Sequence, residues 1–256
     1  MKKKLVAIGG GENGRLLEDG KLAPYNTQKI DEEIVKLTKK KMPHFLFINH
    51  AMPSVEIQES YFKTMKKIYG NKFNCVCDDL KTIELEDELK VKEKIEWADI
   101  IYEGGGDTSY MITLWQKVGF DKILYDAWNK GKVICGISAG AVCWFQDCNS
   151  ECSNEENLKS NLFKSVNGLN WIKLHLTPHC NENGRHESAK LQLKANGLIG
   201  IMLSNCAALE ILDDQYKLIL SDENAYGIKA YWDKDKYVEE QILISDELKN
   251  INELLN

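Results

Sequence analysis

Long apolar runs are absent from this sequence of 256 residues. No segment approaches the roughly 20 consecutive apolar residues that a membrane-spanning helix requires. The first apolar segment, residues 5–8, follows three lysines at positions 2–4. It is too short to be the apolar region of a signal peptide. We therefore expect no membrane partner and a cytoplasmic location.

An excess of basic charge is absent as well. The 33 Lys and Arg residues are outnumbered by 39 Asp and Glu residues, which gives a net charge of −6 at pH 7. Binding to nucleic acid needs a basic face that neutralises phosphates, so we expect no nucleic acid partner. The chain also lacks linkers and low-complexity segments. We predict a single α/β domain over residues 1–256.

The eight cysteines lack the two tight Cys or His pairs that are typical of a structural zinc site. A zinc site built from Cys148, Cys152, His179 and Cys180 stays open as an alternative, but we expect no metal. Because no secretion signal is evident, we expect free thiols rather than disulfides.

The first apolar run ends in three glycines, residues 9–11, which resemble the start of a phosphate-binding loop. Neither of the two standard patterns for such loops follows. We interpret the glycines as a tight exit from a strand, with nucleotide binding as the alternative, and we expect no cofactor.

Apolar runs and helical patterns alternate along the first half of the chain. Short strands are predicted at residues 4–9, 44–49, 73–77, 100–102 and 133–135, and helices at 27–40, 54–69, 85–98, 108–118 and 124–130. Such alternation is typical of a three-layer fold, in which a mostly parallel central sheet carries helices on both faces. In sheets of this kind the ligand site lies beyond the carboxyl ends of the strands.

The second half of the chain is richer in strands. Residues 144–161 are polar and without periodicity, so we predict a loop there. The other expected elements are strands at 169–176, 206–212, 217–220, 225–232 and 236–244, a helix at 188–196, and a helical or frayed tail at 247–256. The later strands are expected to extend the sheet or to pack on its edge.

Residues 136–140 read GISAG, directly after the apolar strand at 133–135. The pattern G-x-S-x-G between a strand and a helix is typical of a nucleophile elbow, which exposes the serine hydroxyl on a sharp turn. The amide of Ala139 would face the start of the helix, where it could bind an oxyanion. The alternative is a strand-to-helix turn in which Ser138 has no chemical role.

A serine needs a base to take its proton, and histidine is the usual one. His179 follows Pro178 at the end of a predicted strand, which would hold an exposed imidazole in place. His50 is a weaker candidate, and we interpret His175 as structural. Several acids could orient the imidazole: Asp147, Glu151, Glu155 and Glu156 after the elbow, and Glu103 and Asp107 beside a glycine triplet.

The glycine triplet, residues 104–106, lies between a strand and a helix. Glycines in this position leave backbone N–H groups accessible, and these could supply a second oxyanion donor opposite Ala139. A flexible strand-to-helix turn is the alternative interpretation.

Three segments together resemble the dipeptidase E and cyanophycinase family of serine peptidases. They are GGGDT at residues 104–108, GISAGAVCWF at 136–145 and LTPH at 176–179, and the stretch at 205–210 is also similar. The resemblance implies the fold of class I glutamine amidotransferases, with serine in place of the nucleophilic cysteine.

The resemblance also implies roles for individual residues. Ser138 would be the nucleophile, His179 the general base, and the amides of Gly105, Gly106 and Ala139 the oxyanion hole. The third member of the triad would be an acid in the loop after the elbow. Glu151 is the first choice and Asp147 the reserve.

The implied substrate is a small peptide, with aspartyl dipeptides as one option, and hydrolysis would need neither metal nor cofactor. Asp107, Thr108 and Arg185 are expected to bind the substrate, and Arg185 could pair with a substrate carboxylate. Two other functions stay open: an esterase or amidase acting on a non-peptide substrate, and a catalytically silent binding protein of the same fold. A homodimer is an oligomeric state compatible with the sequence.

Overall fold

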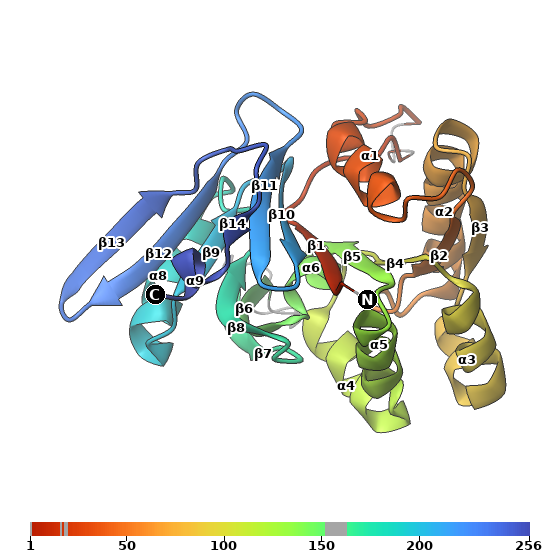
Figure 1. The fold of residues 1–256 in the computed structure, drawn as a ribbon. Coiled ribbons are helices and arrows are strands. Elements are labelled where there is room, and N and C mark those ends of the chain that lie inside the picture. Colours follow the sequence, from red (N-terminus) through yellow and green to blue (C-terminus); the bar gives the residue numbers. More distant parts are fainter. Residues whose placement is uncertain (1, 16, 18–19, 152–162) are drawn as a thin grey trace.

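The computed structural model describes residues 2–15, 17, 20–151 and 163–256. Its central sheet has eight strands in the order β14-β11-β10-β1-β5-β4-β2-β3 (Figure 1). Five strands are parallel: β1 (Lys4–Ile8), β5 (Val133–Ile137), β4 (Ile100–Glu103), β2 (His44–Ile48) and β3 (Val76–Asp79). Three antiparallel strands extend the sheet beyond β1: β10 (Ala207–Leu212), β11 (Gln215–Leu220) and β14 (Lys249–Asn250).

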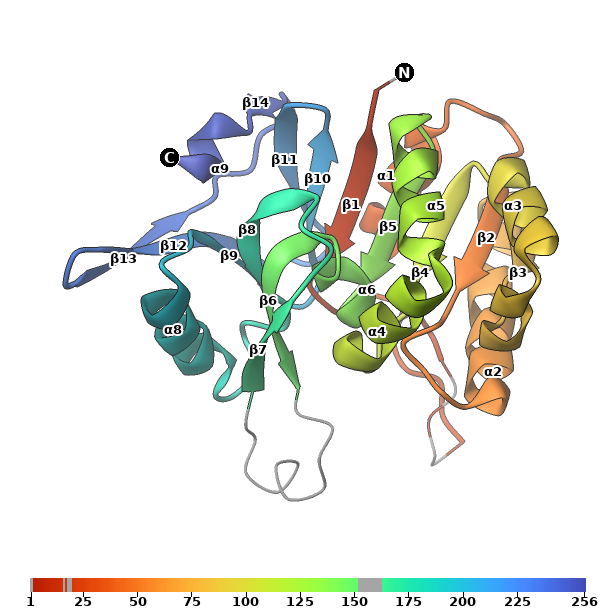
Figure 2. The same ribbon diagram turned by 90° about the horizontal axis from the view of Figure 1, so that it is seen from below.

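Helices cover both faces of this sheet because successive side chains of each strand point to opposite faces. In β1, Leu5 and Ala7 belong to the apolar core on one face, and Val6 and Ile8 to the core on the other. The first face is covered by η2 (Thr82–Glu86), α3 (Glu88–Trp97), α4 (Thr108–Val118) and α5 (Phe120–Asn129), and the second by α1 (Gln28–Leu37), α2 (Val55–Met65) and η1 (Lys66–Lys72) (Figure 2). The predicted three-layer α/β architecture is confirmed.

A second sheet lies beside the first and has six strands in the order β13-β12-β9-β8-β6-β7. They are β13 (Lys236–Gln241), β12 (Gly227–Asp233), β9 (Gly200–Leu203), β8 (Ile172–Thr177), β6 (Phe145–Glu151) and β7 (Phe163–Asn167). Helix α8 (Arg185–Asn196) packs on this sheet through Ala189 and Leu193, which share a buried apolar cluster with Met202 and Ala230. Two short helices, α6 (Ala139–Val142) and α9 (Asn252–Leu255), complete the described elements.

The predicted loop at 144–161 was wrong for its first half, which forms β6. This strand has no apolar alternation because its buried positions include polar residues that find partners in the fold. Asp147, Asn149 and Ser150 are all buried, and they bind His175, Arg185 and Thr108 respectively. Residues 152–161 of the predicted loop lie outside the described residues.

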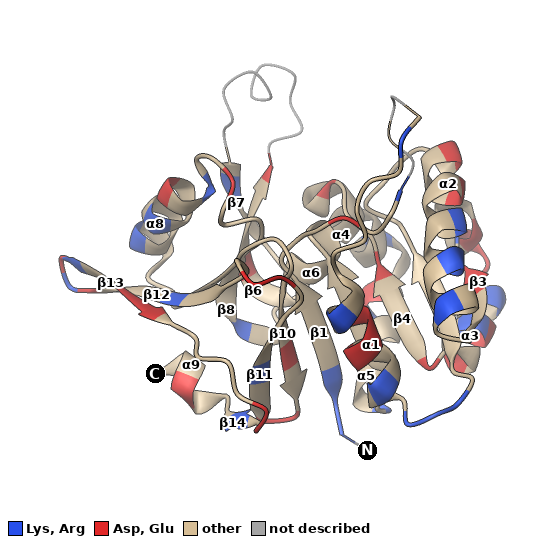
Figure 3. Ribbon diagram, turned by 90° about the horizontal axis from the view of Figure 1, so that it is seen from above, with Lys and Arg blue, Asp and Glu red and all other residues tan. Residues whose placement is uncertain are grey.

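The third strand also begins later than predicted, at Val76 rather than near Phe73. The chain leaves α2 through the π-helical turn η1, which extends the helical segment to Lys72. Acidic and basic residues are interspersed along α2 and α8 rather than separated by sign (Figure 3). None of the helices in the described part of the chain is both long and apolar enough to span a bilayer.

Candidate active site

Ser138 lies on a sharp turn between β5 and α6, where its backbone is held at φ 55° and ψ −114°. The two glycines of the elbow are required by close packing. A Cβ atom at Gly136 would lie 2.4 Å from the carbonyl oxygen of Gly140, and one at Gly140 would lie 2.3 Å from that of Glu103. A strained backbone such as that of Ser138 is common at functional sites. The close packing of the two glycines holds this turn in place.

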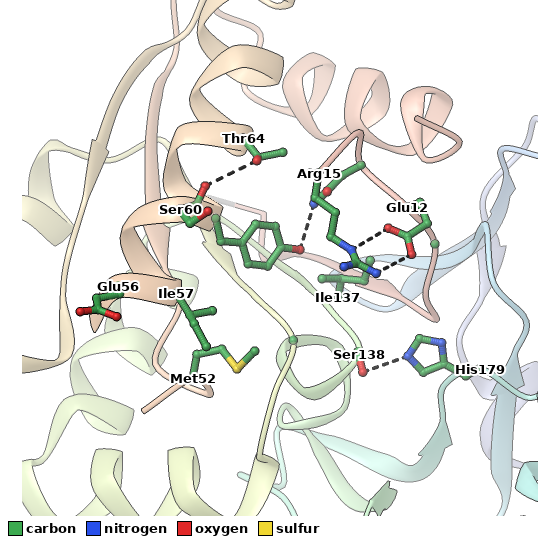
Figure 4. A pocket seen from close by; sticks show the side chains of 14 residues that line it. Glu12, Arg15, Met52, Glu56, Ile57, Ser60, Thr64, Ile137, Ser138 and His179 are labelled. Atoms are coloured by element: carbon green, nitrogen blue, oxygen red, sulfur yellow. Dashed lines mark hydrogen bonds and ion pairs between the residues drawn. The ribbon is translucent and has the colours of Figure 1, made fainter. Parts of the chain in front are cut away.

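The hydroxyl of Ser138 is hydrogen-bonded to the imidazole of His179, with 3.0 Å between Oγ and Nε2 (Figure 4). The other ring nitrogen, Nδ1, lies 2.6 Å from Oδ1 of Asn205. The side-chain NH₂ group of Asn205 donates to Glu182 Oε1 at 3.2 Å, so its oxygen is left to face the imidazole. Nδ1 therefore carries the proton, and Nε2 is free to accept the proton of the serine hydroxyl.

Sequence reasoning missed the group that orients His179. Asn205 lies in the turn between β9 of the second sheet and β10 of the central sheet. Glu182 is also within 3.2 Å of Nδ1, and its hydrogen bond with His179 lowers the pKa of its carboxyl to about 2. Both residues were visible in the sequence, but Asn205 is an amide rather than an acid, and Glu182 lies in a polar stretch without a motif.

The two acids predicted for this role are used elsewhere. Glu151 accepts a hydrogen bond of 2.6 Å from Arg185, and its side chain is 66% exposed. Asp147 binds Nδ1 of the buried His175 at 2.6 Å. The choice of Glu151, with Asp147 in reserve, is therefore corrected: neither contacts His179. Glu155 and Glu156, the other acids considered after the elbow, lie outside the described residues.

The buried histidine of the second sheet is structural, as expected. His175 is fully buried, and its Nε2 lies 3.0 Å from Oγ1 of Thr177. Asp147 also accepts a hydrogen bond from Asn196 at the end of α8. This cluster joins β6, β8 and α8, and its member Thr177 lies two residues before His179.

The exit from β1 binds the backbone of three segments that contribute to the site. Three successive carbonyl groups, of residues 8, 9 and 10, accept hydrogen bonds from the amides of Ser138, His179 and Cys206 at 3.0, 2.9 and 2.9 Å. The glycines at 9–11 are thus a tight strand exit, as interpreted from the sequence. Their carbonyl groups hold segments that follow strands of the two sheets next to one another.

Backbone amides are available next to the serine hydroxyl. Among the described residues, none accepts a hydrogen bond from the amides of Gly105, Gly106 or Ala139. A Cβ atom at Gly105 would lie 4.0 Å from Oγ of Ser138, so the triplet runs directly beside the hydroxyl. Backbone amides without an acceptor beside a nucleophilic hydroxyl could bind a tetrahedral oxyanion.

A buried carboxyl group lies directly before the glycine triplet. Glu103 is fully buried, and its Oε1 accepts a hydrogen bond of 3.2 Å from the amide of Ala51, whereas its Oε2 has no partner among the described residues. Burial raises the pKa of Glu103 well above its ordinary value. Glu103 does not contact His179. Its hydrogen bond with Ala51 instead ties the turn after β2 to the end of β4.

Of the three residues expected to bind substrate, two line a cavity beside Ser138 and one does not. Asp107 caps α4, with Oδ1 accepting from the amide of Tyr110 at 2.9 Å, and it lines neither cavity beside Ser138. Thr108 and Arg185 both line a small cavity that Ser138 shares. Arg185 is 2% exposed, and its Nε atom has no hydrogen-bond partner among the described residues.

Two cavities meet at Ser138. The smaller, about 140 Å³, is lined by ten residues: Gly106, Thr108, Ser138, Ala139, Val142, Asn149, Ser150, Glu151, Pro178 and Arg185. The larger, about 570 Å³, lies between α2 and the loop after β1. It is lined by residues of these two segments and by Met52, Gly105, Ile137, Ser138 and His179 (Figure 4). The hydroxyl is therefore reachable from both sides.

No group of three or more His, Cys, Asp or Glu side chains in the described ranges could hold a metal ion. The alternative zinc site included Cys152, which lies outside those ranges. His50, the weaker candidate base, is buried and binds Leu80 and Trp115 instead of Ser138. Burial lowers the pKa of His50 to about 4.

Gly10→Ala is expected to lower catalytic activity by about ten- to a hundredfold. A Cβ atom at this position would lie 2.0 Å from Oδ1 of Asn205 and 2.3 Å from Nδ1 of His179, so the pair must move apart. Small displacements of catalytic groups carry losses of this size. The measurement is kcat/KM, with Gly70→Ala as control because its Cβ would meet no atom closer than 3.4 Å. Equal activity of the two variants would contradict this account of the loop.

Comparisons of the sequence with known proteins match peptidases. The sequence model of peptidase family S51 matches residues 16–219. The uncharacterized peptidase YgaJ of Bacillus subtilis (strain 168) is 29% identical over 235 residues, which cover 90% of this chain and 91% of that protein.

Solved structures show the same fold at lower identity. A peptidase from an acI-B1 Actinobacterium superimposes with a TM-score of 0.67 at 20% identity, covering 98% of this chain and 97% of the other. A putative peptidase E protein from Listeria monocytogenes EGD-e gives a TM-score of 0.59 at 17% identity, covering 86% and 99%. The predicted class I glutamine amidotransferase-like fold is confirmed.

Proposed function

Because the chain belongs to peptidase family S51, we propose that it is a serine peptidase that hydrolyses small peptides through an acyl-enzyme on Ser138. The observation that carries the proposal is the hydrogen bond of 3.0 Å between the Ser138 hydroxyl and Nε2 of His179. An imidazole in this tautomer is a general base for the hydroxyl, on a turn built to expose it.

Acylation begins when the hydroxyl oxygen attacks the peptide carbonyl and Nε2 takes its proton. The oxyanion then receives hydrogen bonds from the amides of Ala139 and of the triplet glycines Gly105 and Gly106. Charge on the imidazolium is stabilised by Asn205 and by the Glu182 carboxylate, 3.2 Å from Nδ1. Nε2 next gives its proton to the leaving amine, which departs with the C-terminal part of the substrate.

Deacylation repeats these steps with water. Nε2 takes a proton from the water, the hydroxide attacks the ester of Ser138, and the proton returns to the serine oxygen. The products are two peptide fragments or amino acids, and none of the steps requires a metal or a cofactor.

The substrate residue on the acyl side is proposed to be acidic. Arg185 is a buried cation in the small cavity, and its charge is balanced by Glu151, whose side chain is mostly exposed. A substrate carboxylate could take the place of Glu151 on this guanidinium, whose planar group suits such a pair. The stacking of Arg185 on Phe163, with 4.1 Å from Cζ to the ring centre, would hold it in place. Aspartyl dipeptides are therefore the first substrates to test.

The test is hydrolysis of a dipeptide library by the purified protein, together with labelling by a fluorophosphonate probe. We expect labelling of the wild-type protein, none of Ser138→Ala, and cleavage that favours an N-terminal acidic residue. Labelling without cleavage of any peptide would support an esterase or amidase. A folded wild-type protein that shows neither would support a silent binding protein.

A further inference from the structure

The direction in which a substrate crosses Ser138 follows from where the proton must go. His179 has to protonate the leaving amine, so that nitrogen must come within hydrogen-bond distance of Nε2. His179 lines the large cavity and not the small one. Of the three proposed oxyanion donors, Gly106 and Ala139 line the small cavity, whereas Gly105 lines the large one. Arg185, the proposed partner of an acidic acyl residue, also lines the small cavity. The acyl residue therefore lies on the small side and the leaving residue on the large side.

Four large apolar or aromatic side chains line the large cavity beside its polar residues. Met52, Ile57, Tyr61 and Ile137 line it, and they come from the turn after β2, from α2 and from the end of β5. Figure 4 shows Met52 and Ile57 across the cavity from Arg15. Ile57 is 47% exposed, so an apolar side chain bound against it would remove apolar surface from water.

The charges around this cavity disfavour an acidic leaving residue. The guanidinium of Arg15 is bound by both carboxylate oxygens of Glu12, each at 2.9 Å. Glu56 also lines the cavity and has no ion-pair partner among the described residues. Arg15, the one Lys or Arg among the lining residues, is thus neutralised, and the carboxylate of Glu56 leaves a net negative charge.

We propose that the large cavity binds the residue that leaves on acylation, and that this residue carries a large apolar side chain. The inference rests on the proposed function, because it uses the role of His179. The cavity of about 570 Å³ has about four times the volume of the acyl-side cavity of about 140 Å³. A preferred dipeptide therefore has a small acidic residue first and a residue such as leucine or phenylalanine second.

The experiment measures binding without turnover, so that it stands apart from the test of catalysis. Ser138→Ala protein is titrated calorimetrically with Asp-Leu, Asp-Gly and Asp-Glu, which share the acyl residue. We expect Asp-Leu to bind with a Kd about tenfold lower than Asp-Gly, and Asp-Glu to bind no better than Asp-Gly. A hydrophobic pocket discriminates side chains by factors of this size.

Substitutions on α2 then locate the preference. Ile57→Asn, made in the Ser138→Ala protein, is expected to reduce the ratio of the two Kd values to below about threefold. Val55→Asn is the matched control, because Val55 is 42% exposed on the same helix and does not line the cavity. The ratio should persist in that control.

Each result separates the two proposals. Equal Kd values for Asp-Leu and Asp-Gly, or binding of neither, would overturn the assignment of the large cavity, even if the wild-type protein hydrolyses both. A preference for Asp-Leu that survives Ile57→Asn would overturn it as well. Preferential binding of Asp-Leu, lost in Ile57→Asn, by a protein whose wild type cleaves no peptide would support the cavity and reject the peptidase function.

Discussion

Ser138→Ala is expected to lower kcat/KM for dipeptide hydrolysis by at least about 10⁴-fold. Without the hydroxyl no acyl-enzyme can form, and the remaining oxyanion donors and cavities are expected to give only about 10³- to 10⁴-fold acceleration over water. Removal of the nucleophile in serine proteases has effects of this order or larger. The measurement is the steady-state rate on an aspartyl dipeptide, at enzyme concentrations high enough to detect the residual activity.

A matched substitution shows whether the loss is specific. Ser109 is a half-buried serine in the first turn of α4 that lines neither cavity. Ser109→Ala should retain activity within about threefold, as expected for surface substitutions with little effect on stability. A Ser138→Ala protein that unfolds at the wild-type temperature yet keeps most of its activity would exclude Ser138 as the nucleophile.

The elbow could be predicted from the sequence because its signal is local. A strand, two glycines and a serine between them define the turn, and packing of the backbone against Glu103 explains both glycines. The approach of His179 was also predicted, from its position after a strand end. The structure shows that this strand, β8, belongs to the second sheet, so the two residues meet across the junction of the sheets.

The group behind His179 could not be predicted, because it depends on how that junction is built. Asn205 reaches the imidazole only because the chain crosses from β9 to β10 at this point, and the amide of Cys206 donates to Gly10. Asp147 and Glu151 were reasonable candidates by type and by distance along the chain. Both lie on β6, where Asp147 binds His175 and Glu151 binds Arg185. Acid side chains close in sequence to a nucleophile are therefore a weak guide when a second sheet intervenes.

Asn205→Ala is expected to lower kcat by about 10²- to 10³-fold, with little change in KM. Loss of Oδ1 removes the acceptor 2.6 Å from Nδ1, so the imidazole loses its fixed tautomer and orientation. Loss of the third member of a serine protease triad costs about 10⁴-fold, and a neutral amide should contribute less than a carboxylate. The measurement is kcat and KM on one dipeptide, with thermal unfolding followed in parallel.

The pH profile distinguishes orientation from a purely structural role. Asn205→Asp keeps an acceptor oxygen and adds a carboxylate beside His179, which stabilises the protonated imidazole. The base then becomes neutral only at higher pH, so the acidic limb of kcat against pH should move upward, while much of the activity lost in Asn205→Ala returns.

Glu182 keeps the amide of Asn205 turned so that its oxygen faces the ring, through the bond of 3.2 Å to Nδ2. Glu182→Ala should therefore lose activity in the wild-type background but much less in the Asn205→Asp background, because a carboxylate has no wrong face to present. Equal losses in both backgrounds, or an unshifted acidic limb, would mean that Asn205 supports the fold of the turn and does not orient His179.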